Sequence, residues 1–152
     1  MPAAGFWAIE SHDIRFGRDG NWYSDGERIV NPRIALLFSR SLKKRPEGGY
    51  QLQMGDERAA IEVEDTPFVV RRVDGDPAGG FSVVLNDESV EPLDPGTLTV
   101  GPDDALVCRV KDGAHEARFL RSAQSQLAPA MAEVGGGFAL RTSHGDFPIR
   151  AR

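Results

Sequence analysis

The sequence predicts an α+β protein made of two repeated strand–turn–helix–hairpin units, joined by an acidic strand-rich segment, with mainly antiparallel sheet. Three observations predict this. Helical and strand-like apolar spacings occur in the same order in both parts of the chain. An Asp-Gly turn precedes a Gly-Gly pair by 23 residues from Asp25 to Gly48, and by 24 residues from Asp112 to Gly136. A Gly-Asp turn follows each pair, at residues 55–56 and 145–146.

The alternative is that two unrelated units need turn glycines at similar places. On the repeat interpretation, the chain divides into an N-terminal extension at residues 1–12, a first repeat unit at 13–73, connecting strands and loops at 74–100, and a second repeat unit at 101–152. The length of 152 residues suits one compact domain or two small modules.

The first unit begins with a predicted hairpin, because the apolar residues of 14–16 and 22–23 flank the turn-rich segment 17–20. Asn31 followed by Pro32 then predicts the start of a helix. An apolar face follows at helical spacing and is expected to be buried: Ile34, Leu37, Phe38 and Leu42. Three cations at 43–45 and a proline at 46 predict where this helix ends.

Strands are predicted for the middle of the chain. Apolar and polar residues alternate over residues 50–54 and 61–64, as expected for strands with one wet face. Shorter apolar runs at 68–70, 81–85, 98–100 and 105–110 predict further strands, separated by Gly/Pro/Asp loops.

The last third predicts a long helix that begins near His115 and ends at the glycines of 135–137. Pro129 lies inside its apolar stripe, so a kink or break is expected there. A closing hairpin is predicted from Phe138 to Ile149.

Charge and composition exclude several classes of protein. The formal net charge is −5, but the charge is unevenly distributed. Between Asp56 and Asp104 there are 13 acidic and three basic residues, and the rest of the chain has an excess of basic residues. This acidic balance argues against nucleic acid as a partner. The longest apolar runs are far shorter than the ~20 residues that cross a bilayer, and the first residues do not resemble a secretory signal. We therefore expect a cytoplasmic protein with no membrane partner.

Four segments carry a resemblance to a known family. The sequence resembles the bacterial domain-of-unknown-function family 1285 from about Asp13 to Ile149, most specifically at 61–68, and also at 19–23, 34–42 and 110–118. The resemblance implies an α+β architecture with repeated motifs and a suggested role in signal transduction. No catalytic residues are established for this family, so none is transferred to this chain.

Glu62, Glu64 and Asp65 form the first candidate site, with Arg71 on the next predicted strand as an ordinary cross-strand partner. Glu62 and Glu64 are two residues apart, so their carboxylates are expected on one strand face. Such a group could bind a cation or perform acid–base chemistry in a cation-assisted hydrolase. The alternative is a solvated strand face.

Arg40, Lys43, Lys44 and Arg45 form a second candidate, a patch that could bind a phosphate or an acidic partner. The alternatives are a solvated helix end and a contact with nucleic acid through residues 40–45.

The sequence gives little support for a metal site, a catalytic nucleophile or a phosphate-binding loop. The three histidines lack metal-ligand spacing, and the lone Cys108 lies in an apolar run typical of a buried thiol. No nucleophile motif or phosphate-binding loop is present, so we expect no cofactor, no metal and no catalytic residues. The leading hypothesis is a non-catalytic module that binds a small molecule or a protein. Whether the chain forms a homo-oligomer is left open. The hydrolase is the alternative.

Overall fold

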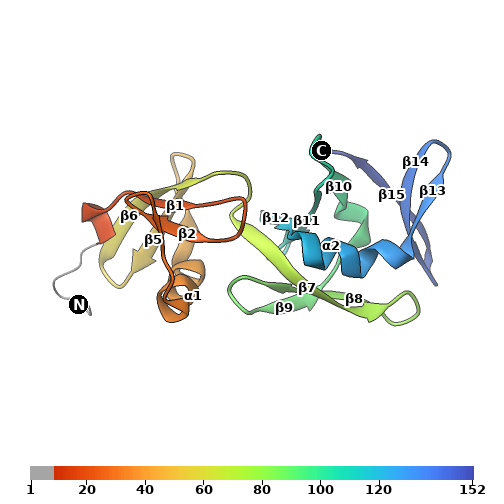
Figure 1. Cartoon of the computed structure of the whole chain (residues 1–152), viewed down its shortest axis with the longest axis horizontal. Coiled ribbons are helices and arrows are strands. Elements are labelled where there is room, and N and C mark those ends of the chain that lie inside the picture. Colours follow the sequence, from red (N-terminus) through yellow and green to blue (C-terminus); the bar gives the residue numbers. More distant parts are fainter. Residues whose placement is uncertain (1–8) are drawn as a thin grey trace. The chain divides into compact units, whose positions relative to one another are not determined.

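The computed structural model describes residues 9–152 and divides into two compact units, Met1–Pro67 and Phe68–Arg152. Each unit has its own sheet (Figure 1). Residues 1–8 of the predicted N-terminal extension lie outside the described part. The finer four-part division of the chain stays a prediction.

The predicted α+β fold class is wrong. Strands account for 49% of the chain and helices for 17%, and the two sheets are mixed. Residues 9–152 contain two α-helices. The strand–turn–helix–hairpin unit expected from the turn spacing is therefore not the building block of this protein.

The first unit is a six-stranded sheet with one α-helix. Its strand order is β3-β2-β1-β6-β5-β4, in which β1 and β6 are parallel and the other neighbours are antiparallel. The elements are η1 (Ile9–Ser11), β1 (Ile14–Phe16), β2 (Trp22–Ser24), β3 (Glu27–Arg28), α1 (Pro32–Ser41), β4 (Leu42–Lys44), β5 (Tyr50–Met54) and β6 (Glu57–Val63).

Local signals correctly predicted the opening of this unit. The hairpin of β1 and β2 forms with Phe16 opposite Trp22. Asn31 caps α1, because its side-chain oxygen accepts a hydrogen bond from the backbone N–H of Arg33 at 2.9 Å. Pro32 occupies the first helical position, where its missing N–H costs no hydrogen bond.

The end of α1 and its buried face differ from the prediction. The helix ends at Ser41, and Leu42–Lys44 forms β4 against β5. Of the predicted apolar face, Phe38 is buried on the helix, whereas Ile34 and Leu37 are 41% and 49% exposed. Ser39 and Ser41 are buried instead. Two hydroxyl side chains of this segment are thus buried, and two large apolar side chains of the helix are exposed.

Aromatic packing explains this orientation. Trp22 is almost completely buried, and its ring lies 4.8 Å from that of Phe16 and 5.6 Å, edge-on, from that of Phe38. The indole Nε1 donates a hydrogen bond to Ser39 Oγ at 2.9 Å. Because a buried indole N–H requires an acceptor, this bond fixes which face of α1 meets the sheet.

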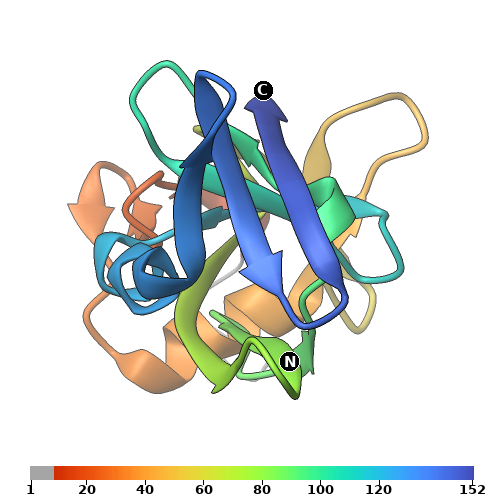
Figure 2. The same ribbon diagram turned by 90° about the vertical axis from the view of Figure 1, so that its right-hand side faces the viewer.

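The second unit is a nine-stranded sheet of order β13-β14-β15-β10-β11-β12-β7-β8-β9. Figure 2 shows its last three strands side by side, with α2 next to them. The elements are β7 (Phe68–Asp76), β8 (Gly80–Leu85), β9 (Val90–Pro92), η2 (Pro95–Thr97), β10 (Thr99–Val100), β11 (Leu106–Val110), β12 (His115–Phe119), α2 (Arg121–Leu127), η3 (Ala128–Ala130), β13 (Met131–Val134), β14 (Gly137–Thr142) and β15 (Gly145–Ala151).

The prediction of a long helix from His115 is wrong at both ends, because strands lie there. Residues His115–Phe119 form β12, which pairs with β11 and with β7. The α-helix has seven residues and passes into a 3-10 turn that contains Pro129, and Met131–Val134 forms β13. The strands β10–β15 share with β1–β6 the connectivity of their strands, with the first and last of each six parallel.

Within residues 9–152, we find no helix long and apolar enough to cross a lipid bilayer.

Candidate functional site

A shallow basic cavity of about 630 Å³ lies on the first unit and is the candidate site. We call it the basic cavity. It is lined by β4, β5 and β6 and the turn after β4: Lys43, Lys44, Arg45, Pro46, Glu47, Gln51, Gln53, Arg58 and Ala60.

Strand register brings these residues together. Lys43 pairs with Gln51, Gln51 with Ala60, and Gln53 with Arg58. Leu42, Leu52 and Ala59 at the alternate positions are buried in the core. Because successive side chains point to opposite faces of a sheet, Lys43, Gln51, Gln53, Arg58 and Ala60 project from the outer face. Lys44 alternates with Lys43 and reaches the cavity at its end, next to the turn that follows β4.

The polar groups of the basic cavity include several without a partner. Within residues 9–152, Lys43 and Arg58 make no ion pair, and the side-chain amides of Gln51 and Gln53 make no hydrogen bond. Lys43 and Arg58 are exposed, and both glutamines are partly buried. Two cations and two amides thus face the cavity with their hydrogen-bonding capacity available to a ligand.

Arg45 and Glu47 form an ion pair among the residues that line the cavity. The Nη2 atom of Arg45 lies 3.2 Å from Glu47 Oε2. The hydrogen bond from Arg45 lowers the pKa of the Glu47 carboxyl. Four cations and one carboxylate therefore line the cavity, which favours an anion.

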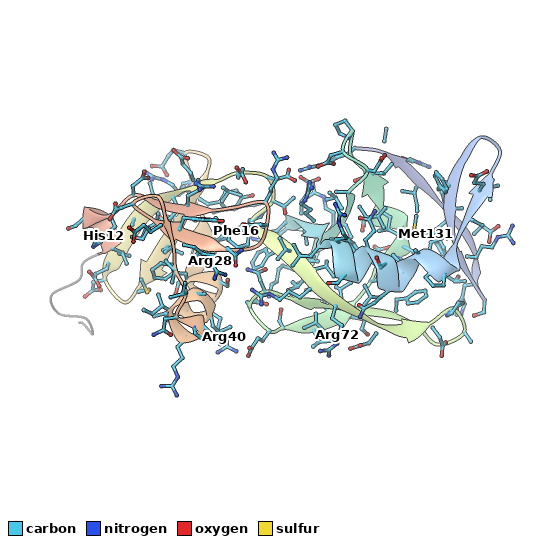
Figure 3. All side chains as sticks on the ribbon, viewed as in Figure 1. His12, Phe16, Arg28, Arg40, Arg72 and Met131 are labelled. Carbon is cyan, nitrogen blue, oxygen red and sulfur yellow. The ribbon has the colours of Figure 1, made fainter. Side chains whose placement is uncertain are left out.

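The predicted basic patch is divided by the fold. Lys43, Lys44 and Arg45 line the basic cavity, whereas Arg40 lies on α1 and its side chain extends away from the helix (Figure 3). Gln51, Gln53 and Arg58 were missed. Their alternation with apolar neighbours was visible in the sequence, but the pairing that collects them beside Lys43 depends on contacts between strands.

The predicted acidic group lies elsewhere on this unit. Glu62 is in β6 opposite Arg15 of β1. Glu64 Oε1 accepts a hydrogen bond from the backbone N–H of Arg18 at 2.7 Å, and its carboxylate lies 3.6 Å from Arg15 Nη1 and 3.7 Å from Arg18 Nε. The carboxylate of Glu64 therefore links the β1–β2 turn to the end of β6.

We predict that Glu64→Gln lowers the free energy of unfolding by about 1 kcal/mol or less, because the amide keeps one acceptor oxygen and loses two half-exposed ion pairs. Urea denaturation at low and high salt measures this. The loss is expected to shrink at high salt. A loss that does not change with salt contradicts the ion-pair assignment.

Asp65 and Arg71, the other members of the acidic candidate, do not form a metal site with Glu64. Asp65 is half-buried, and Arg71 is an exposed residue of β7 in the second unit. In residues 9–152 there is no group of three His, Cys, Asp or Glu side chains that could hold a metal ion.

A polar cluster in the second unit was also missed by the sequence analysis. Lys111 Nζ lies 2.6 Å from Asp87 Oδ2 and 3.0 Å from Ser89 Oγ, and Ser89 Oγ donates to Asp87 Oδ1 at 2.5 Å. The ammonium also lies 5.2 Å from the centre of the Phe68 ring. These bonds join the β8–β9 turn to the β11–β12 turn, and their tight pairing indicates a structural role.

Cys108 is fully buried in β11, as expected. Burial raises the pKa of its thiol to about 12, with a further contribution from the negative charges of Glu91 and Asp94. A thiol in this state is not a nucleophile at neutral pH.

Comparisons with known proteins agree with the resemblance seen in the sequence. Residues 7–66 match the family model of the N-terminal domain of DUF1285, a domain of unknown function. No match is found among curated proteins.

Two solved structures are similar to this chain. A DUF1285 family protein from Silicibacter pomeroyi DSS-3 is 25% identical, with a TM-score of 0.71, over 99% of this chain and 87% of its own. A DUF1285 family protein from Shewanella baltica OS155 has the same fold, with 18% identity and a TM-score of 0.62, over 79% of this chain and 93% of its own. Together with the sequence match, these similarities confirm the resemblance to the DUF1285 family, whose N-terminal domain model matches residues 7–66.

Proposed function

We propose that this protein is a binding module whose basic cavity takes a small multivalent oxyanion, either free or as part of a larger small molecule. The observation that supports this proposal is a set of four polar side chains that line the cavity and have no partner among residues 9–152: Lys43, Gln51, Gln53 and Arg58.

Electrostatics favour an anion with more than one negative charge. Guanidinium groups bind carboxylate or phosphate oxygens in pairs, and ammonium groups bind them as point charges. Arg45 and Lys44 lie beside Lys43 and Arg58, and one carboxylate, that of Glu47, opposes them. A multivalent anion can compensate several of these charges at once.

The two glutamines extend recognition beyond charge. Each side-chain amide offers two N–H donors and one carbonyl acceptor. Gln51 and Gln53 are on the same strand face, two residues apart, between the cations of β4 and β6. A ligand with neutral polar groups next to its charges fits this arrangement better than a bare anion.

Two expectations from the sequence, a role in signal transduction and a cytoplasmic location, are compatible with an anion-binding module. A receptor for a small anion suits the role in signal transduction that the family resemblance suggests. We also propose a cytoplasmic location, where phosphorylated and carboxylated small molecules are available as ligands.

Inorganic pyrophosphate and citrate are suitable probes for isothermal titration calorimetry with the full chain. We expect both anions to bind at one site, with an affinity that falls as salt rises. The double variant Lys43→Ala/Arg58→Ala is expected to bind at least tenfold more weakly, because it removes the two cations that lack partners.

Arg28→Ala/Arg33→Ala is the matched control. It also removes two exposed positive charges from the first unit, from β3 and α1, outside the cavity. Unchanged affinity is expected for it. Absence of binding to either anion, or equal weakening in both variants, would overturn the proposal. Phosphorus NMR of the pyrophosphate mixture is expected to show intact ligand, and release of orthophosphate would support an enzyme.

A further inference from the structure

The helix α1 presents an apolar face to solvent. Val30 just before the helix is 73% exposed, Ile34 is 41% exposed and Leu37 is 49% exposed. Residues spaced by three positions lie on the same side of a helix, so Ile34 and Leu37 form one line, and Val30 lies before the N-cap residue Asn31, outside the helix. We call this line, with Arg33 and Arg40 beside it, the α1 stripe.

The orientation of α1 is fixed by the core and not by its own apolar pattern. Trp22 Nε1 donates to Ser39 Oγ, and Ser41 Oγ donates to the carbonyl of Leu37 at 2.7 Å. These bonds satisfy the two buried hydroxyls of the helix. Burial of Ile34 and Leu37 would have been favourable, so their exposure on a well-anchored helix indicates an interaction surface.

The charge around the stripe has one sign. The helix α1 contains two cations, Arg33 and Arg40, and no acidic residue. Arg33 and Arg40 are exposed and lie beside the apolar line at helical spacing. In Figure 3 the Arg40 side chain extends away from α1. A complementary partner therefore needs apolar side chains to cover Ile34 and Leu37, and carboxylates to face the two arginines.

We propose that the α1 stripe is a docking site for an acidic amphipathic helix of a partner protein. Two helices that pack together bury apolar residues at the same three- and four-residue spacing that the stripe displays. Flanking glutamates on the partner would then lie near Arg33 and Arg40. The length of α1, ten residues, corresponds to about 15 Å of helix and accommodates two to three turns of a partner.

This proposal does not rest on the basic cavity. The stripe residues are on the exposed side of α1, whereas the strand residues of the cavity project from the sheet face opposite to the core that α1 covers. Either proposal can fail while the other holds.

Fluorescence anisotropy with a labelled synthetic peptide tests the docking site on the full chain. The probe is a helical peptide with leucines at three- and four-residue spacing and glutamates on both flanks. We expect it to bind. Ile34→Ser/Leu37→Ser and Arg33→Glu/Arg40→Glu are each expected to weaken binding at least tenfold.

Val90→Ser/Val134→Ser is the control, since these valines of the second unit are 59% and 45% exposed and lie outside the stripe. This control and Lys43→Ala/Arg58→Ala are expected to bind the peptide like the wild type. Circular dichroism verifies that each variant is folded, and all substituted side chains are exposed.

Three results would overturn the proposal. One is weakening by the control variant equal to that by the stripe variants. Another is binding of the full chain to phosphatidylserine vesicles but not to the peptide, which would assign the stripe to a lipid surface. The third is self-association that the stripe variants abolish without peptide binding, which would assign the stripe to a second copy.

Discussion

Replacement of Trp22 by alanine is expected to lower the free energy of unfolding of the first unit by about 3–5 kcal/mol. The side chain is 1% exposed and packs between Phe16 and Phe38. Its removal leaves a large cavity and also deprives Ser39 Oγ of the indole donor. Urea denaturation followed by circular dichroism measures the loss.

Two variants separate the contributions to this loss. Trp22→Phe keeps an aromatic ring and removes the Nε1 donor, so a loss of about 1 kcal/mol is expected from the hydrogen bond, with a further loss from the smaller ring. Tyr23→Ala is the control and removes the neighbouring aromatic side chain, which is partly buried. The Cζ atom of Arg15 lies 4.3 Å from the centre of the Tyr23 ring. If Trp22→Ala costs no more than Tyr23→Ala, the aromatic core does not orient α1 as described.

Lys111→Met is expected to destabilise the second unit by about 2 kcal/mol at neutral pH. The Asp87 side chain is 10% exposed, and the substitution removes the ammonium group that lies 2.6 Å from its Oδ2 atom. Thermal or urea denaturation measures the loss. Asp87→Leu/Lys111→Met removes both charges and is expected to be more stable than Lys111→Met. The opposite order would contradict a buried ion pair.

The same pair makes stability depend on pH. Burial alone would raise the pKa of Asp87, but the hydrogen bonds from Lys111 and Ser89 outweigh it and hold that pKa below the ordinary value. A carboxyl with a lowered folded pKa stabilises the protein above its unfolded pKa of about 3.9, and this contribution is lost as pH falls further. The deficit of Lys111→Met is therefore expected to be largest above about pH 5 and to shrink toward pH 3. A deficit that grows on acidification would contradict the assignment.

Local sequence patterns correctly predicted those elements whose formation depends on residues close together in the sequence. Asn31 and Pro32 marked the start of α1, and the turn after Phe16 marked the first hairpin. The end of α1 could not be predicted in this way. Leu42–Lys44 has no strong strand pattern, and it becomes β4 because β5 offers it backbone partners.

Long-range pairing also explains the error in the second helix. The apolar spacing from Leu120 onward fits a helix, but His115–Phe119 lies between β7 and β11 in the sheet, and Met131–Val134 pairs with β14. Tertiary contacts override helical spacing in such segments. Ser39 of α1 shows the same effect, because the indole N–H of Trp22 in β2 donates a hydrogen bond to its hydroxyl and keeps that side of the helix buried.

The candidate site was predictable only in part for the same reason. Lys43, Lys44 and Arg45 stand out as consecutive cations in the sequence. Gln51, Gln53 and Arg58 join them through the register of three strands, and Arg40 is separated from them because the helix ends at Ser41.

NMR of the labelled full chain titrated with pyrophosphate tests whether a small multivalent oxyanion binds the basic cavity. We predict that the side-chain signals of Arg45, Arg58, Gln51 and Gln53 shift together and saturate with one dissociation constant. The Arg28 signal of the same sheet is expected to stay unchanged. Shifts that do not saturate, or that spread over all arginines of the first unit alike, would contradict the proposal.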